Sequence, residues 1–282
     1  MTEDVSRGTE FPTPQETRII TVANQKGGVG KTTSTVNLAA ALAKSGLQVL
    51  VIDLDPQGNA STALAIPHHK GVPDIYAVLV GAMAIEEVVQ SVPHTPNLWC
   101  VPATIDLAGA ETELVPLMSR EGVLARALKT YLDDHVKNTG RRLDYVFIDC
   151  PPSLGLLTIN AFSAAKEVLV PIQCEYYALE GLSQLGNIVD MVRLNVNGQL
   201  RITTMLMTMF DGRTRLAQDV VDDVRRRFPD LTLKTLIPRS VRLSEAPSQD
   251  QTVLNYDPDS VGALAYIAAA SELANRGTYV SQ

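Results

Sequence analysis

The sequence lacks the features that mark secreted and membrane-spanning proteins. None of its 282 residues belong to an apolar run approaching the roughly 18 residues that a membrane helix needs. Residues 1–17 are polar, contain two prolines and lack the apolar centre of a signal peptide. We therefore expect a cytoplasmic protein that begins with a disordered tail over residues 1–17.

Cysteine and histidine are also scarce. The three cysteines, Cys100, Cys150 and Cys174, are far apart, odd in number and form no C-x-x-C pair. The four histidines show no metal-ligand spacing. These patterns exclude a disulfide framework and a zinc-held fold, and they favour a reducing compartment.

The overall charge is acidic. A net charge of −7 and a pI near 5.1 argue against a surface that coats nucleic acid or an anionic membrane throughout. A local basic segment remains compatible with this average. The hydrophobic fraction of 45% and the charged fraction of 20% are those of an ordinary globular chain.

Short apolar runs rich in β-branched residues alternate with longer helical patterns. The candidate strands are residues 19–23, 49–53, 98–101, 145–149, 168–171, 202–207 and 233–237. The candidate helices are residues 31–45, 106–116, 121–138, 155–165, 176–196, 214–228 and 259–275. Several strands are apolar throughout, as in parallel sheets that are covered on both faces. The alternation predicts a doubly wound, mostly parallel α/β sheet flanked by helices. We expect one domain over residues 18–276, followed by a short polar tail at 277–282.

A glycine-rich turn joins the first strand to the first helix. Its residues 24–33 read NQKGGVGKTT. The glycines allow successive backbone N–H groups to face phosphate oxygens, and the helix N-terminus attracts the same anion. The predicted cradle consists of Gly27, Gly28, Val29 and Gly30. Lys31 is placed to contact the β- and γ-phosphates, Thr32 to ligate Mg²⁺ and Thr33 to contact the α-phosphate. This motif predicts binding of ATP with Mg²⁺.

Two more strands end in acidic residues. Residues 49–59 form an apolar strand followed by DPQGN, and residues 145–153 form a strand followed by CPPS. Ligands of open α/β sheets bind beyond the carboxyl ends of the strands, where these acids lie. We interpret Asp149 as a Mg²⁺ ligand, direct or through water, and Asp55 as the group that orients the attacking water. Asp53 is either part of this site or the N-cap of the next helix.

The phosphate loop departs from the usual pattern. Gln25 stands where a P-loop has glycine, and Lys26 follows it. In this, residues 24–33 resemble the deviant Walker A motif of the ParA/MinD superfamily. The resemblance implies that Lys26 reaches the nucleotide of a second subunit, so that ATP binding and homodimer formation are coupled. Lys26, Lys31 and Asp55 are then the predicted catalytic residues.

The resemblance to ParA/Soj-type chromosome partition ATPases extends over roughly residues 17–275. It rests on DLDPQGN at 53–59, IDCPPS at 148–153, TMFDGRT at 208–214 and IPRSVRLSEAPS at 237–248. It implies an ATPase with slow turnover whose ATP-bound dimer binds double-stranded DNA without sequence preference. A ParB-like protein would stimulate hydrolysis and so release the dimer, which would be associated with the nucleoid. By the same resemblance, Pro238 borders the adenine pocket.

A basic segment lies within the acidic chain. Between Asp211 and Glu245 there are eight basic and six acidic residues. The resemblance implies that Arg213 and Arg242 in this segment hold DNA phosphates. The alternative is that these arginines are structural and pair with Asp211 or Glu245.

Two other functions within the superfamily are less consistent with the sequence. A MinD-like membrane ATPase needs a basic amphipathic C-terminal helix, whereas this chain ends in SELANRGTYVSQ. We therefore expect no membrane partner. An electron-transfer protein like the nitrogenase iron protein needs two suitably placed cysteines for an interfacial cluster, and no such motif is present.

Overall fold

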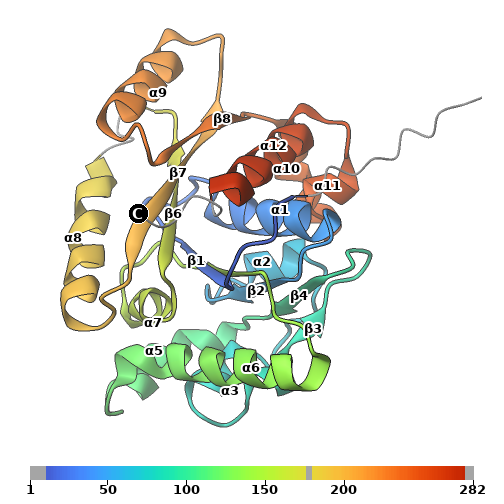
Figure 1. Cartoon of the computed structure of the whole chain (residues 1–282), viewed down its shortest axis with the longest axis vertical. Coiled ribbons are helices and arrows are strands. Elements are labelled where there is room, and N and C mark those ends of the chain that lie inside the picture. The colour runs from blue at the N-terminus through green and yellow to red at the C-terminus, as the bar shows by residue number, and fades with distance from the viewer. Residues whose placement is uncertain (1–10, 176–179, 277–282) are drawn as a thin grey trace, which may run out of the picture.

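The strands of the chain form one sheet (Figure 1). The computed structural model describes residues 11–175 and 180–276. Over these residues eight strands pair in the order β3-β4-β2-β5-β1-β6-β7-β8. Their bounds are β1 Arg18–Val22, β2 Val49–Asp53, β3 Gln90–Ser91, β4 Leu98–Val101, β5 Tyr145–Asp149, β6 Glu167–Gln173, β7 Arg201–Phe210 and β8 Thr232–Pro238. All pairs are parallel except β3 with β4, at one edge. The predicted doubly wound, mostly parallel sheet is confirmed.

Helices cover both faces of this sheet (Figure 1). They are α1 Lys31–Lys44, α2 Asn59–Ala63, α3 Ile75–Leu79, α4 Ile85–Val88, α5 Ala110–Leu114, α6 Val123–Thr139, α7 Leu156–Ala164, α8 Glu180–Asn195, α9 Arg215–Arg227, α10 Val241–Glu245, α11 Val253–Tyr256 and α12 Val261–Arg276. α1 and α12 pack in the apolar core on one face. α6, α7, α8 and α9 pack in the core on the other face. None of the helices in the described part of the chain is long and apolar enough to cross a bilayer.

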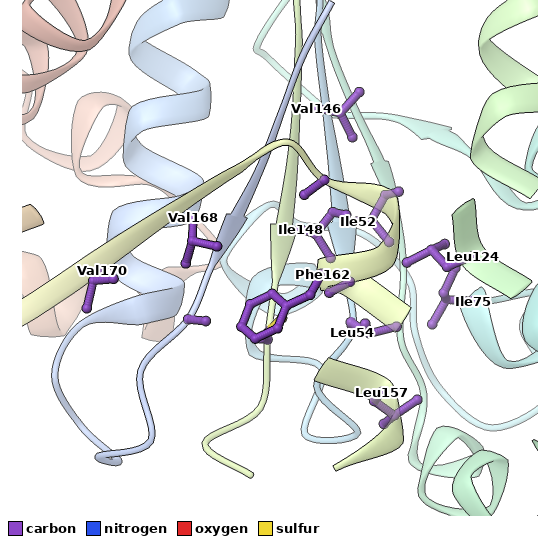
Figure 2. Packing of buried hydrophobic residues seen from close by; sticks show 14 of the residues in the cluster. Ile52, Leu54, Ile75, Leu124, Val146, Ile148, Leu157, Phe162, Val168 and Val170 are labelled. Carbon is purple, nitrogen blue, oxygen red and sulfur yellow. The ribbon is translucent and has the colours of Figure 1, made fainter. Parts of the chain in front are cut away.

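The central strand β5 shows why the strand sequences are apolar throughout. Val146 and Ile148 point into the core beneath α7, where Figure 2 shows Ile148 near Phe162. Tyr145 and Phe147 belong to the opposite core, beneath α1 and α12. Successive side chains of a strand point to opposite faces, so a strand covered on both sides has no polar face.

The strand register gathers the three predicted motifs at one edge. Val22 of β1 pairs with Asp149 of β5, and Asp53 of β2 pairs with the same Asp149. The loops that follow β1, β2 and β5 therefore leave the sheet side by side. These are the phosphate loop, the DPQGN loop and the CPPS loop.

Residues 11–17 pack against the sheet, although the sequence placed them in a disordered tail. Phe11 is buried in the core beneath α12, and the Thr17 hydroxyl donates to the Leu143 carbonyl over 2.6 Å. Burial of the Phe11 ring accounts for the packing of this segment. The residues around Phe11 are polar or are prolines and offer little other apolar surface. The remainder of the expected tail, residues 1–10, lies outside the described residues, as do residues 176–179 and the expected tail at 277–282.

Candidate nucleotide-binding site

The phosphate loop has a backbone that requires glycine. Gly28 and Gly30 have φ angles of 73° and 87°, in the left-handed region that glycine enters without strain. Gly30 is also the N-cap of α1. The Thr208 hydroxyl of β7 donates to the Val29 carbonyl over 2.8 Å, and this bond fixes the loop against the sheet. The loop is thereby held open above the N-terminus of α1.

Lys31 begins α1 and is nearly buried. Its side chain lines a cavity together with the loop glycines, and the residue is only 7% exposed. Its ammonium donates to the Lys26 carbonyl over 3.4 Å. Burial lowers the pKa of Lys31, while the carboxylates of Asp149 and Asp55 oppose that change. A buried ammonium is best stabilised by an anion, so this position suits a phosphate group.

Asp149 lies at the end of β5 and is held by two hydroxyl groups of α1. Thr32 Oγ1 donates to one carboxylate oxygen over 2.7 Å, and Thr35 Oγ1 donates to the other over 2.8 Å. Burial raises the pKa of Asp149 to about 7, and the nearby charge of Asp53 adds to the rise. Thr32 and Asp149 together offer the hard oxygen ligands that Mg²⁺ prefers. Thr35 was not predicted, although three residues beyond Thr32 it faces the same side of the helix.

Asp53 organises the loop that carries Asp55. It is fully buried, and its Oδ2 accepts from the Ser61 amide over 2.8 Å and from the Ser61 hydroxyl over 2.7 Å. Its Oδ1 accepts from the Asp55 amide over 3.2 Å. Burial raises the pKa of Asp53 to about 6. Asp53 therefore serves the start of α2 much as an N-cap does, which agrees with the structural alternative in the sequence interpretation.

A cavity of about 590 Å³ brings most of the predicted residues together. Its lining includes Gly27, Gly28, Gly30, Lys31, Thr32, Thr33 and Asp55. The volume lies within the usual range for small-molecule sites. The lining also includes Pro152, Met209, Pro247 and Gln251, none of which the sequence interpretation had assigned. Pro238 is not in this lining; it ends β8, where it pairs with Phe210.

Lys26 is also outside the cavity lining. Its ammonium binds Glu175 Oε2 of the same chain over 3.1 Å, and its side chain is 40% exposed. Its amide donates to Asn24 Oδ1 over 3.0 Å. The lysine is thus held at the rim of the site while Lys31 faces the interior.

The two arginines of the basic segment are exposed and paired. Arg213 is 88% exposed and holds both carboxylate oxygens of Asp211, at 2.9 and 2.7 Å. This contact lowers the pKa of Asp211 to about 2. Arg242 binds Glu245 at 3.0 Å and Asp257 at 3.2 Å. The pairs of Arg213 with Asp211 and of Arg242 with Glu245, which the alternative interpretation of these arginines expected, are therefore both formed. Exposed pairs of this kind contribute only about 0–1 kcal/mol, so they do not prevent exchange for a phosphate.

The fold and the site define a class of protein. They are those of a P-loop nucleotide-binding protein. Such a protein has a parallel sheet, a glycine-rich loop that leads into a helix, and a threonine–carboxylate pair beside the lysine of the loop.

Comparison with known proteins shows to which family of P-loop proteins the chain is related. A family model described as an AAA domain matches residues 17–202. The chain is 49% identical over 260 residues to the sporulation initiation inhibitor protein Soj of Bacillus subtilis, covering 92% of this chain and 99% of the relative. It is 46% identical over 261 residues to the chromosome partitioning protein ParA of Myxococcus xanthus, covering 93% and 89%. Among solved structures, a cobyrinic acid a,c-diamide synthase of Mycobacterium smegmatis with a bound ATP analog and magnesium has a TM-score of 0.79 at 36% identity. The match covers 94% of this chain and 98% of that one.

The chain belongs to the Soj/ParA family of chromosome-partitioning proteins within the ParA/MinD group of P-loop proteins. The resemblance derived from the four motifs is confirmed. The identity to the partitioning relatives, 49% and 46%, also exceeds the 36% identity to the synthase.

Proposed function

We propose that the chain is an ATP-dependent switch in DNA partition that hydrolyses ATP slowly. The observation that carries the proposal is the oxygen pair of Thr32 and Asp149, joined over 2.7 Å, beside the buried Lys31. The donor set fits Mg²⁺, and the cationic, glycine-lined cavity fits a nucleoside triphosphate. The magnesium and ATP analog bound to the Mycobacterium smegmatis structure support this assignment.

The predicted site residues have separate parts in the hydrolysis of ATP to ADP and phosphate. Lys31 holds the β- and γ-phosphates, the loop amides from Gly27 to Gly30 bind phosphate oxygens, and Thr33 contacts the α-phosphate. Thr32 and Asp149 would hold Mg²⁺, and the ion would supply positive charge beside the phosphates. Asp55 accepts a hydrogen bond from the attacking water and aligns it. The hydrogen bonds of Asp53 keep the Asp55 loop in place.

The adenine binds near the far wall of the cavity. Met209, Pro247 and Gln251 line the cavity there and offer an apolar surface with one amide group. Pro238 ends β8, in the chain segment before Pro247, and remains a predicted neighbour of this pocket.

Two chains with bound ATP form a homodimer in which Lys26 of each serves the nucleotide of the other. This dimer binds double-stranded DNA without sequence preference through Arg213 and Arg242, and pairing of two chains doubles the number of contacts. A ParB-like partner stimulates hydrolysis, which releases the chains from DNA. The protein is then cytoplasmic and associated with the nucleoid. The name of the Myxococcus xanthus relative, a chromosome partitioning protein, supports a role in DNA partition.

Co-sedimentation with long double-stranded DNA tests the proposal. Binding should require ATP, should be lost with ADP or without nucleotide, and should weaken steeply as salt rises. Anionic lipid vesicles, sedimented in parallel, test the MinD-like alternative. Equal DNA binding with and without ATP would refute the switch, and ATP-dependent binding to vesicles alone would favour the membrane function.

A further inference from the structure

Lys26 and Glu175 form an ion pair next to the phosphate loop, where Lys26 directly precedes Gly27, a residue of the cavity lining. The two residues are 149 positions apart, and the Lys26 ammonium lies 3.1 Å from Glu175 Oε2. Glu175 follows β6, which is a neighbour of β1 in the sheet. The pairing therefore depends on the fold and is not a local feature of either loop.

Glu175 has further partners on its other oxygen. Gln173 Nε2 donates to Oε1 over 2.6 Å, and an Arg239 guanidinium nitrogen lies 3.6 Å from the same oxygen. Arg239 follows β8, in the basic segment between Asp211 and Glu245. The carboxylate thus keeps two donors if Lys26 leaves it. The Lys26 backbone stays anchored through Asn24, whose own amide donates to the Pro171 carbonyl over 2.7 Å.

We infer that Glu175 is a positioning residue that holds Lys26 in the single chain and thereby sets how readily ATP drives dimer formation. The inference rests on the proposed role of Lys26 at the nucleotide of a second chain. In this proposal the Lys26 ammonium, which lies 3.1 Å from Glu175 Oε2 in the single chain, leaves that carboxylate to contact a phosphate in another subunit. The pair must open first, and Gln173 and Arg239 lower the cost because they continue to satisfy Glu175.

The exposure of the pair sets the size of the effect. The Lys26 and Glu175 side chains are 40% and 45% exposed. Pairs with this exposure shift an equilibrium by at most about fivefold. Two pairs open per dimer, so loss of the contact should lower the dimer dissociation constant by the square of the single effect, up to about 25-fold. An effect of this size tunes a switch without blocking it.

Two variants separate the contact from the charge. Glu175→Gln removes both, whereas Glu175→Asp keeps the charge and draws it back from Lys26 by one methylene. The dimer dissociation constant is measured by analytical ultracentrifugation with Mg²⁺ and the non-hydrolysable analogue AMPPNP. The charge-matched control is Asp133→Asn, which breaks a more exposed pair with Lys129 on α6, at 79% and 57% exposure, and should leave the constant unchanged. Both Glu175 variants should tighten the dimer.

Labelling of Lys26 by an acylating reagent, read by mass spectrometry on the nucleotide-free chain, reports the ion pair without any dimer. Its rate should rise two- to fivefold in both Glu175 variants, because an ammonium held by a carboxylate is less available. An unchanged rate overturns the inference, as does a dimer that is unchanged or weakened in Glu175→Gln. Tightening by Glu175→Gln alone would indicate a charge effect and also overturn it. If the parent chain does not dimerise with nucleotide, the proposed function fails and the role of Glu175 in dimerisation fails with it, while the labelling still tests the pair.

Discussion

Replacing Asp149 with asparagine should make the nucleotide-free chain more stable at neutral pH while it removes a proposed Mg²⁺ ligand. The carboxylate is fully buried, and burial with the nearby charge of Asp53 raises its pKa from 3.8 to about 7. The amide keeps the local hydrogen bonds, because its oxygen can accept from one of the two threonine hydroxyls, Thr32 or Thr35, and its nitrogen can donate to the other. The substitution therefore removes the buried charge with little loss of contacts.

The direction of the pH dependence follows from where the proton is bound. Below pH 3.8 the carboxyl group is protonated in both the folded and the unfolded chain, so it contributes no difference. Between pH 3.8 and about 7 the folded chain keeps a proton that the unfolded chain has lost, and stability falls as pH rises. At about 1.36 kcal/mol per pH unit, the loss reaches at most about 4 kcal/mol above pH 7. The Asp149→Asn chain should not lose stability in this way, because asparagine does not ionise.

Urea unfolding of the parent and Asp149→Asn chains at pH 5 and pH 8 measures this effect. The stability gap in favour of the variant should widen between the two pH values by up to about 3 kcal/mol. The exposed-site control Asp133→Asn should change stability by less than about 0.5 kcal/mol at both. Mg²⁺ with ADP should stabilise the parent more at pH 8 than at pH 5, because the metal requires the ionised carboxylate, and should lose this pH dependence in Asp149→Asn. A gap that is the same at both pH values would refute the burial argument.

Substitutions at the remaining site residues give separable outcomes. Lys31→Ala should abolish ATP binding measured by calorimetry, and wild-type affinity would contradict the phosphate-loop assignment. Lys26→Ala should keep nucleotide binding but lose the ATP-dependent dimer in light scattering; a normal dimer would make Lys26 a surface charge. Asp55→Ala should bind ATP and dimerise, yet turn over at least about 100-fold more slowly, because water alignment acts on the chemical step. Arg213→Ala and Arg242→Ala should each flatten the salt dependence of DNA binding by roughly one to two units per dimer while the dimer persists.

The strands were predictable because each is short, apolar and buried on both faces. All seven predicted strands overlap strands of the structure, and β2 and β5 have the predicted bounds of 49–53 and 145–149. The eighth strand, β3, has only two residues and pairs antiparallel at the edge. A strand this short has no periodicity that a sequence pattern could reveal. The helices α2, α3 and α4 are also too short for a periodic pattern, since they have four or five residues each and are held by tertiary packing.

The expected helix at 106–116 shows how local chemistry can divide an element. The structure has a 3₁₀ turn at Ile105–Gly109 and then α5, Ala110–Leu114. The Thr104 side chain accepts a hydrogen bond from the Asp106 amide over 3.2 Å and starts the tighter turn. Gly109 lies at the junction, where glycine disfavours a continuous α-helix.

Site residues could be predicted from the sequence where they lie close together along the chain. The phosphate loop could be found because its glycines, lysine and threonines are consecutive and because each works through backbone geometry or direct contact. Contacts between remote segments left no such pattern. Thr208 holds the Val29 carbonyl from 179 positions away, and Glu175 binds Lys26 from 149 positions away. These long-range contacts fix where the loop and its extra lysine lie before any nucleotide is bound. The substitutions that should change the proposed switch without removing its chemistry are therefore at positions that the sequence pattern did not identify.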